Sequence, residues 1–198
     1  MQKIIFTLSL LGLSVTGFSQ KTELVSFEKQ RVNITKKSML VLGGWSAANM
    51  ITSAFCTKTT HAEMRYFHQM NVQWNGINLL FAALGYWGAD KQDMGKPSTL
   101  ASVLKHQNGS EKTYMLNIGL DVAYIATGLY LTERSKSRAN PAKLKVYGND
   151  IMFQAGFLLL YDAANYMIHH HHGKKLDHWL DKVQVGGVPG GMSLAYGF

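Results

Sequence analysis

Four long stretches of this sequence carry almost no charged residues, and this feature constrains the fold more than any other. The first two contain no Asp, Glu, Lys or Arg, and the last two contain a single aspartate each, Asp121 and Asp162. Each is close to the ~20 residues that a helix needs to cross the hydrocarbon core of a bilayer. The four stretches are residues 38–57, 66–89, 113–132 and 151–168.

A soluble four-helix bundle is the alternative, but its helices would each show a charged outer face. Here the residues that are not apolar are mostly Asn, Ser, Thr, Gly, Trp and Tyr, as in membrane interiors. Charged residues make up only 16% of the chain. We therefore predict an all-α fold, a four-helix transmembrane bundle within residues 38–172. Its helices are expected at about residues 38–57, 66–89, 113–132 and 150–170.

The N-terminus reads as a secretory signal peptide. Lys3 gives a short positive region, an apolar run follows to Val15, and Gly17 and Ser19 are small residues at the positions that precede cleavage. These features predict a cleaved signal peptide at residues 1–19. Residues 20–37 are polar, and we expect them to form a separate N-terminal segment.

The distribution of basic residues bears on partners and orientation. The formal net charge is +8, but no zinc-finger or RNA-binding spacing is present, so we exclude nucleic acid and expect basic side chains beside anionic lipid. The loop at 133–149 is the most basic short one, which agrees with a mature N-terminus outside the cytoplasm. We expect an exported protein of the inner rather than the outer membrane.

Residues 173–198 differ from the rest and are expected to form an amphipathic segment and a short extended tail. Met192, Leu194, Tyr196 and Phe198 alternate with small residues, which is the period of a β-strand. We favour a short hairpin with residues 183–185, or an unstructured tail. The alternative is the last strand of an outer-membrane barrel, although nothing else in the chain offers the alternating strands of a barrel.

Each predicted helix has one polar stripe, because residues three, four and seven apart share a face. The stripes should face each other, since lipid cannot satisfy polar groups. The stripe of the second helix contains Arg65, His68, Asn71 and Asn75, and it continues to Asn78.

Counting residues from the ends of the stretches gives the depth of each polar group, at ~1.5 Å per residue. The count predicts that four polar side chains, one from each helix, lie at the same depth and form one layer around the bundle axis. Tyr124 and Asn165 are expected beside this layer. Two carboxylates in such a layer need a shared proton or a neutralising cation, so the layer is either an ion site or a hydrogen-bond network between helices. The predicted layer consists of Asn49, Asn78, Asp121 and Asp162.

Four consecutive histidines offer a weak candidate metal site. Imidazoles at i, i+3 and i+4 can share an ion, but consecutive residues fan around a helix and do not converge as a group. We find no motif for catalytic residues, and no cofactor is indicated. The candidate metal ligands are His169, His170, His171 and His172.

The blocks "MLVLGGWSAANM" and "RYFHQMNVQWNGIN" resemble an uncharacterised bacterial family of small four-helix membrane proteins, a domain of unknown function. The resemblance covers about residues 30–170. It implies an integral membrane bundle and carries no activity or active residues.

We therefore expect an integral membrane protein that interacts with the lipid bilayer, and three functions stay open. The first is a non-catalytic scaffold or partner subunit, which binds another membrane protein or a second copy. The second is a proton- or cation-linked transporter or channel component that uses Asp121 and Asp162. The third is a metal-binding membrane enzyme.

Overall fold

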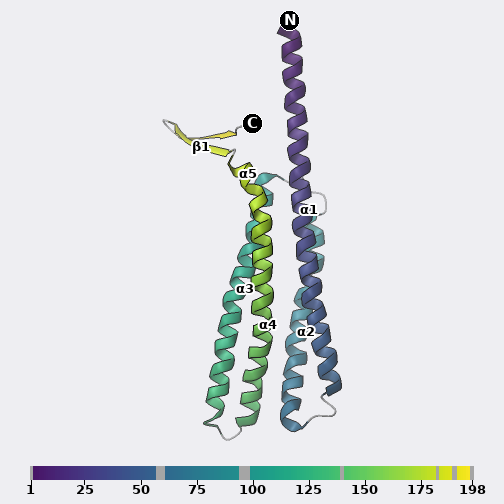
Figure 1. Ribbon diagram of the computed structural model, residues 1–198, viewed down its shortest axis with the longest axis vertical. Helices are drawn as coiled ribbons and strands as arrows, with labels where there is room; N and C mark the ends of the chain where they lie inside the picture. The colour runs from purple at the N-terminus through teal and green to yellow at the C-terminus, as the bar shows by residue number, and fades with distance from the viewer. Residues whose placement is uncertain are drawn as a thin grey trace.

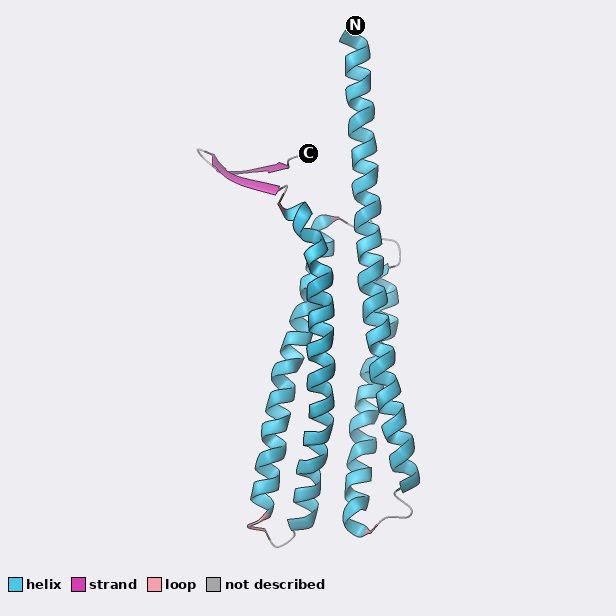
Figure 2. Ribbon diagram, in the orientation of Figure 1, coloured by secondary structure: helices cyan, strands magenta, loops and turns pink. Residues whose placement is uncertain are grey.

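The computed structural model describes residues 2–56, 61–93, 99–138, 141–181, 183–188 and 191–196. Side chains are described between residues 22 and 181, except in the gaps and at residues 62, 63, 90, 92, 93 and 178. Four long helices run up and down beside one another (Figures 1 and 2). They are α1 (Gln2–Cys56), α2 (Ala62–Asp93), α3 (Leu100–Ser135) and α4 (Pro141–Gly173).

Three of the described helical segments are long and apolar enough to cross a membrane. Helix α2 is not among them, because a stripe of His and Asn side chains interrupts its apolar sequence. Those side chains face the other helices, so the predicted four-helix bundle is confirmed although α2 is less apolar than its neighbours. The three segments are Thr22–Cys56, Leu100–Ser135 and Pro141–Leu176.

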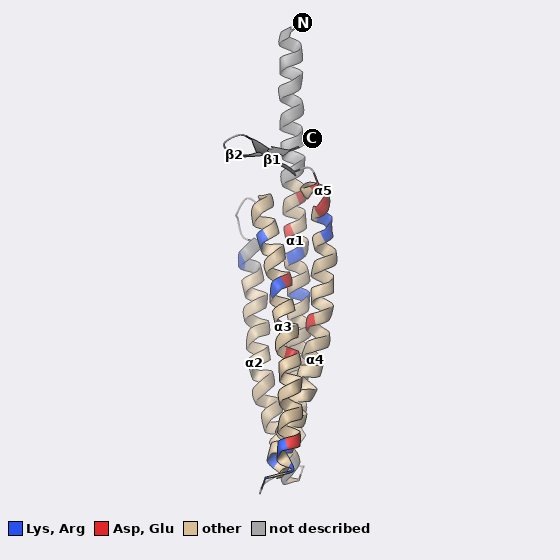
Figure 3. Cartoon of the chain, turned by 90° about the vertical axis from the view of Figure 1, so that its left-hand side faces the viewer, with Lys and Arg blue, Asp and Glu red and all other residues tan. Residues whose placement is uncertain are grey.

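The bundle has apolar side chains outside and many polar side chains inside. Phe55 and Leu160 are 75% and 74% exposed. In contrast, Ser46, Asn75 and Gln154 are fully buried. This is the reverse of a soluble bundle, and it suits a helix bundle surrounded by lipid. Figure 3 shows Lys, Arg, Asp and Glu mainly toward the two ends of the bundle.

The helices extend beyond the uncharged stretches. At about 1.5 Å per residue, α3 is about 54 Å long, whereas the hydrocarbon core is about 30 Å thick. Residues 22–37, predicted as a separate polar segment, continue α1, and Leu24, Phe27 and Arg31 are buried there. The reason is that Lys, Glu, Gln and Arg are good helix formers. The absence of charge marks only the part of a helix inside the bilayer.

The upper end of the bundle has its own small apolar core. Leu24 and Phe27 of α1 pack with Val103 of α3. Two residues that follow α4, Leu176 and Trp179, complete this core. They lie in the short helices η1 (Lys174–Leu176) and α5 (Asp177–Leu180).

The C-terminal tail forms an antiparallel hairpin, as the strand period predicts. Strand β1 (Val183–Val188) pairs with β2 (Gly191–Tyr196). In this register Val183 lies opposite Tyr196 and Val185 lies opposite Leu194. The hairpin follows α5 above the bundle (Figure 1).

Candidate functional site

A groove opens along the bundle between α2 and α3. It forms because the helices pack as two hairpins, α1 against α2 and α3 against α4, while α2 and α3 share hardly any contact. The groove has a volume of about 1010 Å³. Its sides are formed by Trp74–Ala89 of α2 and Lys105–Tyr124 of α3, with α1 and α4 behind.

Two buried carboxyl groups lie at the inner wall of this groove. Asp121 of α3 and Asp162 of α4 are within hydrogen-bonding reach of each other, and Asn117 donates from Nδ2 to Asp162 Oδ1 at 3.4 Å. Two carboxyl groups this close repel each other when both are ionised, unless a proton or a cation lies between them. No Lys or Arg is among the groups that contact this pair in the described part of the chain.

Asn78 of α2 lines the same groove and is buried. Its Nδ2 finds no hydrogen-bond acceptor among the described residues, and Asp121 Oδ2 finds no donor there. Tyr124 also lines the groove, with its ring edge-on to Trp74 at 5.2 Å. The structure thus brings together Asn78, Asp121, Asp162 and Tyr124 of the predicted layer.

Asn49 does not join these residues. Its Nδ2 donates to the Trp45 carbonyl of its own helix at 2.9 Å, and its Oδ1 accepts from Asn71 at 3.4 Å. The residue of α1 at the level of Asp162 is Ser38, whose hydroxyl lies 2.6 Å from the hydroxyl of the neighbouring Tyr161. Ser38 precedes Asn49 by eleven residues, about 16 Å of helix. The depth count failed because the ends of the uncharged stretches lie at different heights in the bundle.

Asn165 is also buried, but its Nδ2 donates to the Tyr161 carbonyl of its own helix at 2.7 Å. It satisfies its own backbone rather than contacting the carboxyl pair.

The stripe of α2 forms a second polar cluster with α1 and α4. Asn71 donates to Ser53 Oγ at 2.7 Å, and His68 Nδ1 is 3.3 Å from the same oxygen. Asn71 Oδ1 accepts from Asn75 Nδ2 at 2.6 Å and also from Gln154 Nε2. We call Ser53, His68, Asn71, Asn75 and Gln154 the amide cluster. Arg65, predicted at the rim of this stripe, is exposed.

Asp150 is a buried residue that the sequence analysis missed. It is fully buried on α4, one turn before Gln154. The sequence carries a signal for it, because Asp150, Gln154, Tyr161 and Asn165 recur at helical spacing on one face. Asp150 directly precedes the fourth uncharged stretch, which begins at Ile151, and it was therefore not counted among the polar residues of that stretch.

The four histidines point toward different neighbours. His169 stacks on Tyr114 with ring centroids 5.3 Å apart, and His172 packs against Phe27 at 4.0 Å. His170 stacks on Tyr166, whereas His171 is exposed. Within the described residues, no three His, Cys, Asp or Glu side chains lie together as metal ligands. The arrangement of these rings is that of aromatic packing.

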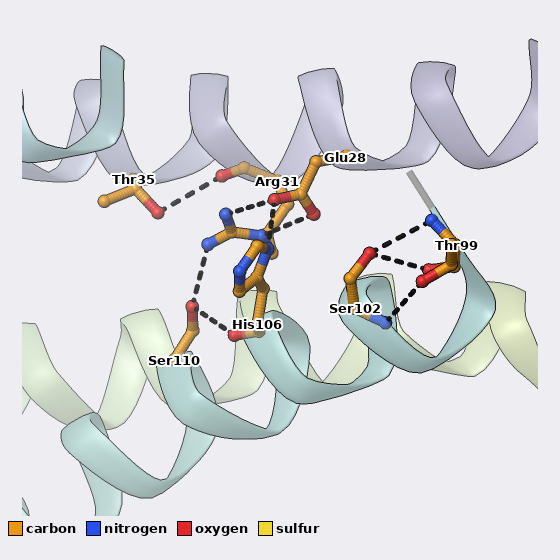
Figure 4. A network of polar contacts seen from close by, with 7 residues as sticks. All are labelled: Glu28, Arg31, Thr35, Thr99, Ser102, His106 and Ser110. Carbon is orange, nitrogen blue, oxygen red and sulfur yellow. Dashed lines mark hydrogen bonds and ion pairs between the residues drawn. The ribbon is translucent and has the colours of Figure 1, made fainter. Parts of the chain in front are cut away.

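An ion network closes the upper end of the groove (Figure 4). Arg31 donates to both carboxylate oxygens of Glu28, at 2.6 and 2.9 Å, and from Nη1 to Ser110 Oγ at 3.2 Å. His106 Nδ1 is 2.8 Å from Glu28 Oε1. Because Glu28 and Arg31 belong to α1 and the other two residues to α3, this network ties the two helical hairpins together.

Comparison with known proteins gives a family but no activity. No curated protein and no solved structure matches the chain. A family model described as "Family of unknown function (DUF6992)" matches residues 41–163. The matched region contains the carboxyl pair, Asp150 and the amide cluster, whereas Glu28, Arg31 and the histidines at 169–172 lie outside it. Since the match covers more than half of the chain, the chain belongs to this family of unknown function.

Proposed function

We propose that this protein is a non-catalytic partner subunit of the membrane, whose α2–α3 groove receives one transmembrane helix of another membrane protein. A single observation supports this proposal: the inner wall of an open groove holds a buried carboxyl pair and a buried amide without an acceptor. These are Asp121, Asp162 and Asn78.

Lipid tails alone are a poor occupant of this groove. Hydrocarbon neither donates nor accepts hydrogen bonds, so each buried polar group that faces it costs several kcal/mol. A partner that carries a polar group at the depth of Asp121 avoids that cost.

The dimensions of the groove fit a helix. Its α3 side, residues 105–124, spans nineteen steps, or about 28 Å, close to the thickness of the hydrocarbon core. Gly88 and Gly109 line the groove, and a Cβ added to either would meet no other atom within 4 Å. Such small residues let the backbone of a second helix approach closely.

The chemistry of the inner wall defines the partner. A carboxyl pair attracts a Lys or Arg side chain, and charged side chains within membranes pair with one another. Lys105 of this chain lines the groove but precedes Asp121 by sixteen residues, about 24 Å of helix. The uncharged stretches of this chain contain no Lys or Arg, so a second copy would not supply the cation.

Photo-crosslinking in native membranes tests the proposal. A photoreactive amino acid replaces Leu120, which lines the groove, or Val122, which is exposed on the same helix but does not line it. We expect Leu120, and not Val122, to capture one membrane protein whose spanning helix carries Lys or Arg. The Asp121→Asn/Asp162→Asn variant should lose this crosslink while keeping its abundance and its elution profile in detergent.

Three outcomes would count against a partner helix. They are equal crosslinking from both positions, capture of a second copy of this chain, and an unchanged crosslink in the double variant.

A second candidate function rests on the contact between Asp121 and Asp162. A carboxyl pair that shares a proton can bind and release that proton or exchange it for a cation. If the protein were a proton- or cation-linked transporter component, purified chain in vesicles would carry proton or sodium flux above that of empty vesicles, and Asp162→Asn would abolish it. An absence of flux in the wild-type chain would exclude this function.

The predicted signal peptide supports export as part of the same proposal. Cleavage after Ser19 would leave the mature N-terminus outside the cytoplasm. Sequencing the N-terminus of chain purified from membranes tests this, and a chain that still begins at Met1 would contradict it.

A further inference from the structure

A pocket of about 670 Å³ opens at the lower end of the bundle, where α3 ends and α4 begins. Ligand pockets in proteins have volumes of roughly 300–1,000 Å³, so this pocket is large enough to hold a ligand. It shares no lining residue with the α2–α3 groove. Its lining consists of Tyr130, Leu131, Arg134 and Arg138 from α3 and the turn after it, and of Lys143, Leu144 and Tyr147 from α4.

Three side chains of this pocket are cations, and no carboxylate accompanies them. Neither Asp nor Glu is among the described residues that line it. Arg134, Arg138 and Lys143 form no ion pair with any residue that the structure describes. Glu133, which precedes Arg134 in the chain, binds Lys136 instead. The pocket therefore carries a net positive charge.

Aromatic rings hold two of these cations in place. Arg134 donates from Nη1 to the Tyr130 hydroxyl, and its Cζ lies 5.6 Å from the centroid of that ring. Lys143 Nζ lies 5.4 Å from the ring centroid of Tyr66 on α2 and 5.6 Å from that of Tyr147. The face of an aromatic ring attracts a cation but has no net charge. These contacts orient the two cations without neutralising them, so both can still bind an anion.

The pocket lies at the level of the bundle where lipid headgroups are expected. Tyr130 is 56% exposed and belongs to the end of the uncharged stretch 113–132, whereas Arg134 lies just beyond that stretch. Tyr is enriched at membrane–water interfaces, where its ring sits among the headgroups. Leu131 and Leu144 give the pocket an apolar part beside its cations. Basic pockets of this kind between membrane helices bind the headgroups of anionic phospholipids.

We propose that this pocket binds the headgroup of one anionic phospholipid, whose phosphate is held by Arg134, Arg138 and Lys143. Leu131 and Leu144 contact the carbon atoms next to the phosphate. Anionic lipid attracts every basic side chain near a membrane surface, but that general attraction depends on the number of charges, whereas a binding site depends on their positions. The site is independent of any partner in the α2–α3 groove.

Native mass spectrometry of the full chain in detergent tests the site, with phosphatidylglycerol as the anionic probe and phosphatidylcholine as the neutral one. We expect the wild-type chain to bind one phosphatidylglycerol more tightly than phosphatidylcholine. Arg134→Gln/Lys143→Gln should weaken this binding about thirtyfold, since a basic side chain beside anionic lipid contributes about fivefold. Lys136→Gln/Lys145→Gln is the matched control, because it removes the same charge from exposed side chains of the same end that do not line the pocket. This control should keep the wild-type affinity.

A second comparison covers the case in which the double variant does not fold. Lys143→Gln and Lys145→Gln make the same change two residues apart on α4, and only Lys143→Gln should weaken the binding of phosphatidylglycerol. The proposal fails if the two lipids bind the wild-type chain equally, or if the pocket variant and its control lose the same affinity. It also fails if inorganic phosphate binds as tightly as phosphatidylglycerol, because the pocket would then select a free anion rather than a lipid.

Discussion

The two ends of the bundle carry ion pairs of the same separation and sequence spacing in opposite surroundings. Glu28 and Arg31 at the upper end are separated by 2.6 Å, and so are Glu133 and Lys136 at the lower end, both at i,i+3 spacing. The upper side chains are 7% and 4% exposed, whereas the lower ones are 74% and 68% exposed. Since distance and spacing are equal, the two pairs differ in burial and in the second hydrogen bond that Arg31 donates to Glu28.

Burial at the upper end comes from α3. His106 and Ser110 contact the pair from that helix (Figure 4), and the apolar core around Phe27 and Leu176 lies beside it. In the lower pair, Glu133 lies in the last turn of α3 and Lys136 caps that helix, so the bond between them stays within one helix end. The Glu28–Arg31 pair therefore takes part in a contact between two helices, whereas the Glu133–Lys136 pair lies on the surface at the end of one helix.

Neutralising Glu28 should produce the largest effect on stability. Glu28→Gln keeps the shape of the side chain but removes the carboxylate that neutralises buried Arg31, and breaking a buried pair on one side costs about 3 kcal/mol. The measurement is the unfolding midpoint of the purified chain in detergent.

The double variant Glu28→Gln/Arg31→Gln is the control. It removes both charges and should recover part of the loss, which would show that the uncompensated charge rather than the lost contact is costly. An unchanged midpoint in Glu28→Gln would mean that water reaches this pair and that the contrast between the two ends is false.

Backbone packing should matter more at the lower end than its ion pair does. A Cβ at Gly148 would lie 2.5 Å from Thr132 Oγ1 and 2.6 Å from the Gly128 carbonyl oxygen. Because one of these contacts is backbone, α3 and α4 would have to separate, and Gly148→Ala should destabilise the chain by about 2 kcal/mol.

Gly119→Ala on α3 is the matched control, because a Cβ there would meet no other atom within 4 Å. It should leave the unfolding midpoint unchanged or raise it slightly, since Ala favours helix over Gly. Equal effects of the two substitutions would refute close packing between α3 and α4.

The sequence predicted the parts of this fold that depend on local pattern. The uncharged stretches indicated the helices, and the spacing of His68, Asn71 and Asn75 correctly placed these side chains inside. The period of residues 192–196 predicted the hairpin strand. In each case the residues that decide the structure lie within one element, so no knowledge of its neighbours is needed.

The contacts between elements could not be predicted in the same way. The bond from His106 to Glu28 joins residues 78 apart in the chain, and no local pattern pairs them. Asn49 was assigned to the wrong neighbours because the relative heights of α1 and α4 depend on residues outside the uncharged stretches. Asp150 was not assigned to the polar interior because it directly precedes the fourth uncharged stretch, residues 151–168, in which the polar stripe was counted.

The smallest effect is expected at Glu133. Its pair with Lys136 is exposed, so water screens both charges, and holding two long side chains together offsets the remaining attraction. Glu133→Gln should therefore leave the unfolding midpoint unchanged within error at low salt. Added salt should not change the difference in unfolding midpoint between this variant and wild type. Measured beside Glu28→Gln under the same conditions, it makes the same chemical change in a pair with the same separation. A loss at Glu133 comparable to that at Glu28 would show that distance, and not burial, determines what these pairs contribute.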